Sequence, residues 1–191
     1  MAVKVTEVIK KVCMLGDPAV GKTSLVHRFV FDLFDDKYLA TIGTKIMKKT
    51  MVLQYPDNAL EVRLTMLIWD ITGHKRHMSI HPAYYEGAEG AFIVGDATRQ
   101  ETVANMRNWV EGFKPVVGKV PMVFLVNKAD LVAGAAFDQK TVEAIARDFG
   151  SIFRLTSAKT GENVERAFTV LGEYLVRDIV ESRGRPGSQV N

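Results

Sequence analysis

One stretch decides the fold of this chain: Gly16-Asp17-Pro18-Ala19-Val20-Gly21-Lys22-Thr23, which fits the pattern G-x-x-x-x-G-K-[ST]. An apolar run over residues 12–15 precedes it, and residues 24–30 after it have apolar side chains at helical spacing. A strand, a glycine-rich loop and a helix in this order are typical of a phosphate-binding P-loop. The alternative for the pattern alone is a glycine-rich turn that happens to match.

Each residue type in this loop suits phosphate binding. Gly16 and Gly21 let the backbone turn back on itself, so that successive N–H groups point into one hollow. The helix that begins at Lys22 adds the positive end of its dipole, and the Lys22 ammonium would reach the outer phosphates. The Thr23 hydroxyl would hold Mg²⁺. The residues expected to bind the phosphates are Gly16, Asp17, Pro18, Ala19, Val20, Gly21, Lys22, Thr23 and Ser24.

Composition narrows the class of protein. The 191 residues are enough for one domain, and the 47% hydrophobic and 25% charged residues are typical of a soluble globular chain. The net charge of +3 is too weak and too scattered to predict nucleic-acid binding. No apolar run approaches the roughly 18 residues of a membrane-spanning helix. The single cysteine, Cys13, is expected in the first strand as a buried, inert thiol, so we expect a cytoplasmic protein.

Apolar periodicity predicts strands that alternate with helices. We expect strands over 8–15, 44–53, 61–70, 90–95, 121–126 and 152–155, and helices over 22–31, 100–113, 138–149 and 162–181. The second and third strands, joined by a turn at residues 56–58, are expected to form an antiparallel hairpin. The remaining alternation predicts an α/β fold with a mainly parallel sheet covered on both faces. One domain is expected over 1–182, followed by a disordered tail over 183–191.

Three further motifs follow expected strand ends. Asp70-Ile71-Thr72-Gly73 has the pattern D-x-x-G, in which the carboxylate can reach the Mg²⁺ shell and the Gly73 N–H could meet a γ-phosphate. In Asn127-Lys128-Ala129-Asp130, the Asp130 carboxylate can accept hydrogen bonds from the N1–H and 2-amino group of guanine, whereas adenine offers neither donor. A solvated turn is the alternative for this tetrapeptide. Ser157-Ala158-Lys159 supplies a backbone N–H for the guanine O6.

At these four motifs, in this order, the sequence resembles the small GTPases of the Ras superfamily, with a Rab-like or Rho-like look. The resemblance runs from about residue 8 to residue 178. It implies a P-loop NTPase fold with a six-stranded, mostly parallel sheet that contains one antiparallel strand. It also implies binding of GTP or GDP with Mg²⁺, and two switch loops, at 32–43 and 73–85, that contact effector, exchange and activating proteins.

The resemblance assigns roles in the first switch loop. Phe34 lies where the family has an aromatic ring over the guanine base, and Tyr38 lies where a tyrosine closes over the phosphates. An ordinary packing role is the alternative for Phe34. Thr41 matches the threonine that completes Mg²⁺ coordination in the GTP state, together with Thr23 and Asp70. Loss of the γ-phosphate would release Thr41 and free the loop.

Several positions depart from the family pattern. His74 stands where most members have the glutamine that orients the attacking water, which makes it the candidate catalytic residue; a solvated loop residue is the alternative. Its unperturbed pKa of roughly 6.5 would make hydrolysis sensitive to pH. Pro18 and Thr72 replace smaller residues near the γ-phosphate. The segment 183–191 has no cysteine for prenylation, so we expect the protein to have no lipid anchor of its own. This pattern is compatible with an archaeal or prokaryotic relative or with a soluble eukaryotic branch.

The sequence therefore predicts a GTP-binding molecular switch that hydrolyses GTP slowly with Mg²⁺. The residues expected to read guanine are Asn127, Lys128, Asp130, Ser157, Ala158 and Lys159. One alternative is a hydrolysis-deficient scaffold that holds GTP permanently, motivated by His74, Pro18 and Thr72. A P-loop ATPase or kinase is a second alternative, which Asp130 disfavours.

Overall fold

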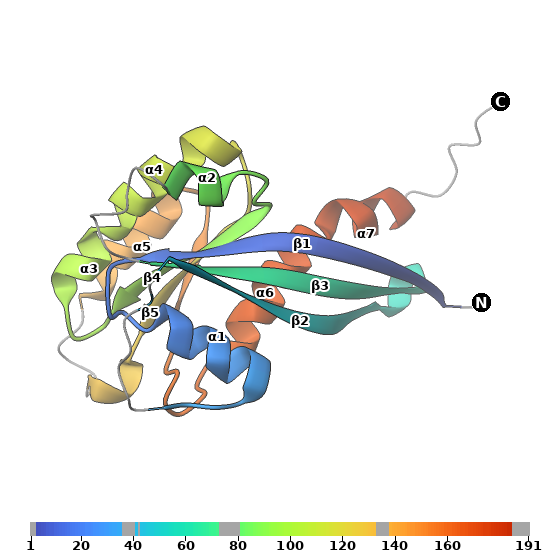
Figure 1. The fold of residues 1–191 in the computed structure, drawn as a ribbon. Coiled ribbons are helices and arrows are strands. Elements are labelled where there is room, and N and C mark those ends of the chain that lie inside the picture. The colour runs from blue at the N-terminus through green and yellow to red at the C-terminus, as the bar shows by residue number, and fades with distance from the viewer. Residues whose placement is uncertain (1–2, 36–40, 42, 73–80, 133–137, 185–191) are drawn as a thin grey trace.

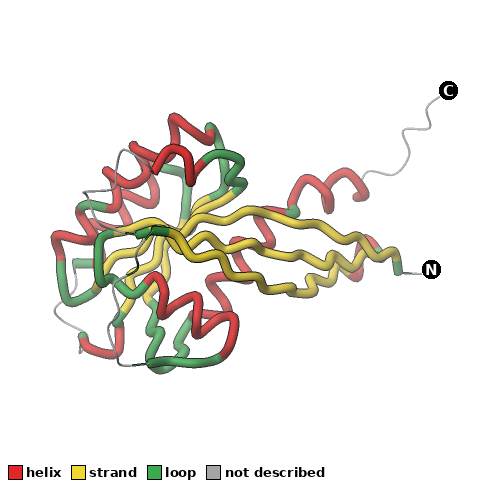
Figure 2. Tube along the Cα trace, in the orientation of Figure 1, coloured by secondary structure: helices red, strands yellow, loops and turns green. Residues whose placement is uncertain are grey.

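The computed structural model describes residues 3–35, 41, 43–72, 81–132 and 138–184. Strands and helices alternate along the chain, as the periodicity predicted (Figure 1; Figure 2). The elements are β1 (Lys4–Gly16), α1 (Lys22–Phe31), β2 (Thr44–Tyr55), a 3₁₀ turn (Pro56–Asn58), β3 (Leu60–Ile71), α2 (His81–Tyr85), β4 (Gly90–Asp96), α3 (Gln100–Ala104), α4 (Met106–Val117), β5 (Met122–Asn127), a second 3₁₀ turn (Ala129–Leu131), α5 (Gln139–Asp148), β6 (Ile152–Leu155), α6 (Val164–Leu175) and α7 (Arg177–Gly184).

The strands form one six-stranded sheet in the order β2-β3-β1-β4-β5-β6. β2 and β3 pair antiparallel, and all other neighbours pair parallel. Only the β2–β3 connection is a short turn, whereas parallel neighbours need a longer crossover. The predicted α/β class, the single antiparallel strand and the hairpin are confirmed.

Helices cover both faces of the sheet (Figure 1). Successive side chains of β1 point to opposite faces, so Val12 and Met14 enter the apolar cluster beneath α1 and α6, while Cys13 and Leu15 enter the cluster beneath α2 to α5. Cys13 is buried, as predicted, and burial raises the pKa of its thiol to about 12. No helix in the described part of the chain combines the length and apolar character needed to cross a bilayer.

The first three strands are longer than predicted and project beyond the rest of the sheet (Figure 2). β1 begins at Lys4 instead of residue 8, because Lys4 pairs with Leu60 and the following residues continue that parallel register with β3. The sequence did not predict this extension, because residues 4–7 are mostly polar and the strand that pairs with them lies far along the chain.

Two predicted helices are each divided in the structure. The helix expected over 100–113 separates into α3 and α4 at Asn105, whose N–H still donates to the carbonyl of Glu101 at 3.0 Å. α4 then continues past residue 113 to Val117. The helix expected over 162–181 divides at Val176 into α6 and α7. α7 includes residues 183 and 184, which the sequence assigned to the tail, and 185–191 lie outside the described residues.

Candidate nucleotide-binding site

The sequence motifs meet at one edge of the sheet. The P-loop leaves the carboxyl end of β1, and Asp70, Asp96 and Asn127 lie at the carboxyl ends of β3, β4 and β5. Ser157 follows β6 by two residues. These strands run parallel to one another, so their carboxyl ends share an edge, which is where open α/β sheets bind ligands.

Both P-loop glycines are required by the geometry. Gly16 has φ 142°, and a Cβ there would lie 2.1 Å from the Val94 carbonyl oxygen. Gly21 has φ 96°, and a Cβ there would lie 2.2 Å from Nδ2 of Asn127. Any larger residue would therefore push the loop away from the strand end or from the β5 motif.

Lys22 is a buried cation folded over the P-loop. Its Nζ donates to the carbonyls of Gly16 at 2.7 Å and Asp17 at 2.9 Å, and only 7% of the residue is exposed. Burial lowers the pKa of its ammonium to about 8, although the charges of Asp70 and Asp17 favour the protonated form. The ammonium bonds only neutral carbonyls in these contacts, so a phosphate oxygen would be a stronger acceptor.

Three oxygen-bearing side chains gather beside Lys22. The Thr23 hydroxyl donates to Oδ2 of Asp70 and lies 2.9 Å from the hydroxyl of Thr41. Burial raises the pKa of the Asp70 carboxyl, and the Thr23 hydrogen bond and the Lys22 charge only partly offset this. The other carboxylate oxygen, Oδ1, is buried and has no hydrogen-bond partner among the described residues.

This donor set fits a hard divalent cation. Mg²⁺ binds hydroxyl and carboxylate oxygens, commonly with only one or two carboxylates and the rest of its shell from phosphates and water. The unpartnered Oδ1 of Asp70 is an acceptor that such an ion would satisfy. No cluster of three histidine, cysteine or carboxylate side chains suited to a metal occurs in the described part of the chain.

The β5 motif holds the P-loop from the other side. Asn127 is buried, and its Nδ2 donates to the Val20 carbonyl at 2.9 Å while its Oδ1 accepts the N–H of Ala158 at 3.1 Å. Asp130 is exposed, and the Ser157 hydroxyl donates to its Oδ1 at 2.6 Å. A carboxylate that is exposed yet fixed at one oxygen is available to a base at the other.

The structure also places some of the remaining predicted residues. Lys128 adopts a left-handed conformation with φ 65°, and its Nζ lies 2.6 Å from Oδ2 of Asp96. The carbonyl of Lys159 accepts a hydrogen bond from Arg28 at 2.7 Å. Phe34 is half-buried against the apolar cluster beneath α1, so its packing role has support, and its place over a base stays a prediction. Tyr38, Gly73 and His74 lie outside the described residues.

Sequence reasoning missed the residues that hold these loops. Oδ1 of Asp17 accepts hydrogen bonds from Nδ2 of Asn105 at 2.5 Å and Nε1 of Trp109 at 2.8 Å. Arg28, from α1, donates to the carbonyl of Ala158 at 2.8 Å. These partners are 88, 92 and 130 residues apart in the chain, so no local pattern signals them.

The Ras family pattern matches residues 11–177, which is most of the chain. The chain belongs to the Ras family. Among its relatives, GTP-binding protein YPT52 of Saccharomyces cerevisiae is 36% identical over 190 aligned residues, covering 86% of this chain and 81% of the relative. Ras-related protein Rab-13 of Bos taurus is 33% identical over 175 residues, covering 91% of this chain and 81% of the relative. The Ras-family identity and the Rab-like character expected from the motifs are confirmed, and the chain is a GTP-binding protein of this family.

Proposed function

We propose that this Rab-like protein is a Mg²⁺-dependent switch that binds GTP, hydrolyses it slowly to GDP, and changes two loops as it does so. One observation carries the proposal. The oxygen-bearing side chains of Thr23, Thr41 and Asp70 and the cation Lys22 lie at the same sheet edge as the motif at 127–130. This arrangement supports phosphate, metal and base contacts to a single nucleotide.

On the phosphate side, Lys22 would exchange its two carbonyl partners for phosphate oxygens, and the N–H groups at the start of α1 would face the same anions. Thr23, Thr41 and Asp70 would hold the metal, with Oδ1 of Asp70 gaining the partner that it lacks among the described residues. Mg²⁺ held by these residues would supply positive charge to stabilise the negative charge that develops during phosphoryl transfer.

On the base side, Asp130 would select guanine by accepting from N1–H and the 2-amino group. The N–H of Ala158 already donates to Asn127 at 3.1 Å, so a bond to guanine O6 would be shared with that contact. Asn127 would act indirectly on the nucleotide, because its side chain holds the P-loop at Val20 and the loop after β6 at Ala158.

Switching and hydrolysis complete the proposal. Thr41 would bind the metal only in the GTP state, and its release would free loop 32–43. His74 would orient the attacking water, and loops 32–43 and 73–85 would bind effector, exchange and activating proteins. The protein would act in the cytoplasm, where GTP is available to it.

The experiment measures binding of fluorescent GTP and ATP to the purified chain, with Mg²⁺ or with EDTA. Tighter GTP binding that weakens in EDTA is expected, and tighter ATP binding would contradict the proposal.

Single-turnover hydrolysis by wild type and His74→Gln, from about pH 5.5 to 8.5, then tests the reaction. A hydrolysis rate that rises through roughly pH 6–7 only in the wild type assigns His74 the role of orienting the attacking water. Bound GTP that is never hydrolysed favours the hydrolysis-deficient scaffold.

A further inference from the structure

A buried carboxylate outside the predicted motifs lies between the phosphate and base loops. Asp96 ends β4, and its side chain is 1% exposed. Its Oδ1 accepts hydrogen bonds from the N–H of Thr98 at 2.9 Å and the Thr98 hydroxyl at 2.7 Å. Its Oδ2 lies 2.6 Å from Nζ of Lys128 and accepts from Nε of Arg99 at 3.1 Å. Burial raises the pKa of the Asp96 carboxyl, but the bonds from Lys128 and Thr98 outweigh it and lower the pKa overall.

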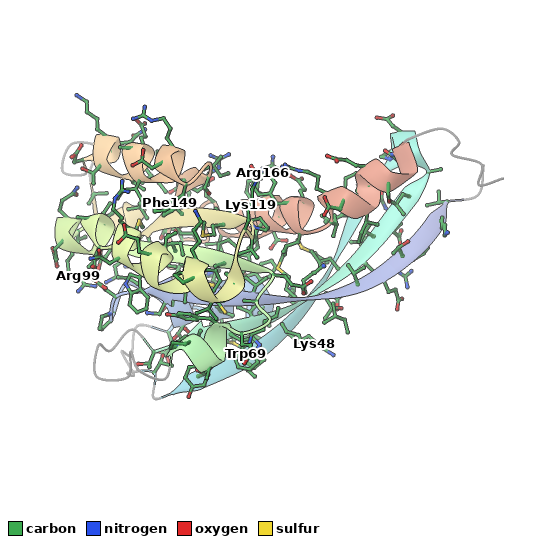
Figure 3. All side chains as sticks on the ribbon, turned by 90° about the horizontal axis from the view of Figure 1, so that it is seen from above. Lys48, Trp69, Arg99, Lys119, Phe149 and Arg166 are labelled. Atoms are coloured by element: carbon green, nitrogen blue, oxygen red, sulfur yellow. The ribbon has the colours of Figure 1, made fainter. Side chains whose placement is uncertain are left out.

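Arg99 extends this contact to the P-loop. Its Nη2 donates to the carbonyl of Pro18 at 2.9 Å, while its Nε stays on Asp96. Figure 3 shows Arg99 where α3 begins, at the end of the molecule away from the projecting strands. The planar guanidinium presents several N–H donors in a fixed geometry, so one side chain can bond both partners at once.

Lys128 completes the chain of contacts on the base side. It belongs to the motif at 127–130, and its backbone is held in a left-handed conformation. The ion pair with Asp96 therefore fixes a side chain of the base loop, while Arg99 fixes the carbonyl of Pro18 in the phosphate loop. The Asp96 carboxylate is thus linked to both halves of the site, directly to Lys128 and through Arg99 to Pro18.

We propose that Asp96 and Arg99 are positioning residues for the nucleotide, which hold the P-loop at Pro18 and the base loop at Lys128 in the spacing that one guanine nucleotide spans. The inference rests on the proposed function. A site fixed in this way before binding loses less conformational freedom when the ligand arrives, so the nucleotide is released more slowly. Without the carboxylate, two cations would remain close together and the link between the loops would be lost.

Asp96 also stabilises the turn into α3, so the test must distinguish this structural role from positioning of the nucleotide. Its backbone N–H bonds the Thr102 hydroxyl at 2.8 Å, and its carboxylate bonds Thr98. Asp96→Asn keeps an oxygen acceptor for Thr98 and removes the charge. Arg99→Lys keeps a cation beside Asp96 but removes the guanidinium N–H group that donates to the Pro18 carbonyl.

The experiment measures the dissociation rate of fluorescent GDP from the full chain with Mg²⁺, together with urea unfolding of the nucleotide-free protein. We expect Asp96→Asn, Arg99→Ala and Arg99→Lys each to release GDP about ten to a hundred times faster, the range of a lost charge-assisted hydrogen bond. Arg99→Lys should unfold as the wild type does. The effects of Asp96→Asn and Arg99→Ala should combine less than additively, because both break the same link. The control Asp148→Asn, which breaks an exposed ion pair with Arg107, should release GDP at the wild-type rate.

Other results overturn the inference. If Arg99→Ala and Arg99→Lys release GDP at the wild-type rate, Arg99 does not position the nucleotide. Faster release only in variants that also unfold more readily would assign Asp96 a structural role alone. If the wild type binds no guanine nucleotide, the proposed function fails and the inference fails with it; if the wild type binds and the variants release normally, only the inference fails.

Discussion

Asn127 is bonded to Val20 across the site: its Nδ2 donates to the Val20 carbonyl at 2.9 Å. The same amide accepts the N–H of Ala158 at 3.1 Å. One buried side chain from the end of β5 therefore joins the P-loop to the loop after β6. Contacts within the protein therefore set the spacing of these three segments.

Replacing Asn127 by alanine should destabilise the empty protein. The substitution leaves the Val20 carbonyl and the Ala158 N–H without this partner, and we expect the free energy of unfolding to fall by about 2–4 kcal/mol. Urea unfolding in EDTA without nucleotide measures this. Gln139→Ala, which removes an exposed amide at the start of α5, is the control and should change stability by less than about 0.5 kcal/mol. An equally small change at Asn127 would show that its bonds contribute little.

Asp70→Asn should stabilise the empty protein and remove its response to magnesium. Burial raises the pKa of the Asp70 carboxyl above the ordinary 3.8. The folded state therefore holds this proton more tightly than the unfolded state, and the associated stability, complete below pH 3.8, is lost as pH rises through the folded pKa. Asparagine is neutral throughout and avoids that loss.

Urea unfolding of wild type and Asp70→Asn in EDTA, at pH 7 and at low pH, checks this expectation. The variant should be the more stable at pH 7, and the difference should disappear below pH 3.8. Nucleotide binding by the variant should be equal in Mg²⁺ and in EDTA. A variant that is less stable than wild type at pH 7 and still responds to Mg²⁺ would contradict both assignments.

Nucleotide binding should take up a proton at alkaline pH. Burial lowers the pKa of Lys22 to about 8, whereas bound phosphates would favour its charged form. Uptake should therefore be small near about pH 6 and rise toward one proton per GDP as the pH passes 8. Calorimetric titration in two buffers of different ionisation enthalpy measures the uptake. Lys22→Arg, which stays charged across this range, should show none; uptake that does not depend on pH would remove Lys22 as its source.

The same pKa shift has a consequence for stability. The ordinary lysine pKa of 10.5 exceeds the folded value of about 8, so the unfolded chain binds more protons between these limits. The free energy of unfolding of the nucleotide-free protein should accordingly gain a contribution from Lys22 as pH rises through that interval. Comparison with Lys22→Arg, which lacks this titration, isolates the contribution.

Local signals were sufficient for the α/β class, the β2–β3 hairpin and the P-loop glycines. Gly16 and Gly21 have positive φ and no room for a side chain, which is the requirement that the P-loop pattern expresses. The hairpin followed from two apolar runs on either side of a short turn. The parallel sheet followed from the alternation of strands and helices.

The contacts that shape the site could not be read from local pattern. Arg99, 81 residues from Pro18, looks like an ordinary polar residue before a helix. The break at Asn105 lies where its side chain bonds Asp17, although nothing in residues 100–113 marks a helix end. The early start of β1 likewise depends on β3, whose hairpin supplies the partner for residue 4.

The most direct test of the account is the nucleotide preference of wild type and Asp130→Asn, measured as affinities for GDP and xanthosine diphosphate by competition with fluorescent GDP. The wild type should prefer GDP. The variant should lose about a hundredfold or more in GDP affinity and gain affinity for xanthosine diphosphate. The reason is that an amide N–H can pair with the 2-oxo group of xanthine, whereas a carboxylate cannot. Asp148→Asn, the same change at an exposed ion pair, should keep the wild-type preference. Unchanged GDP affinity in Asp130→Asn would contradict the claim that this site reads guanine.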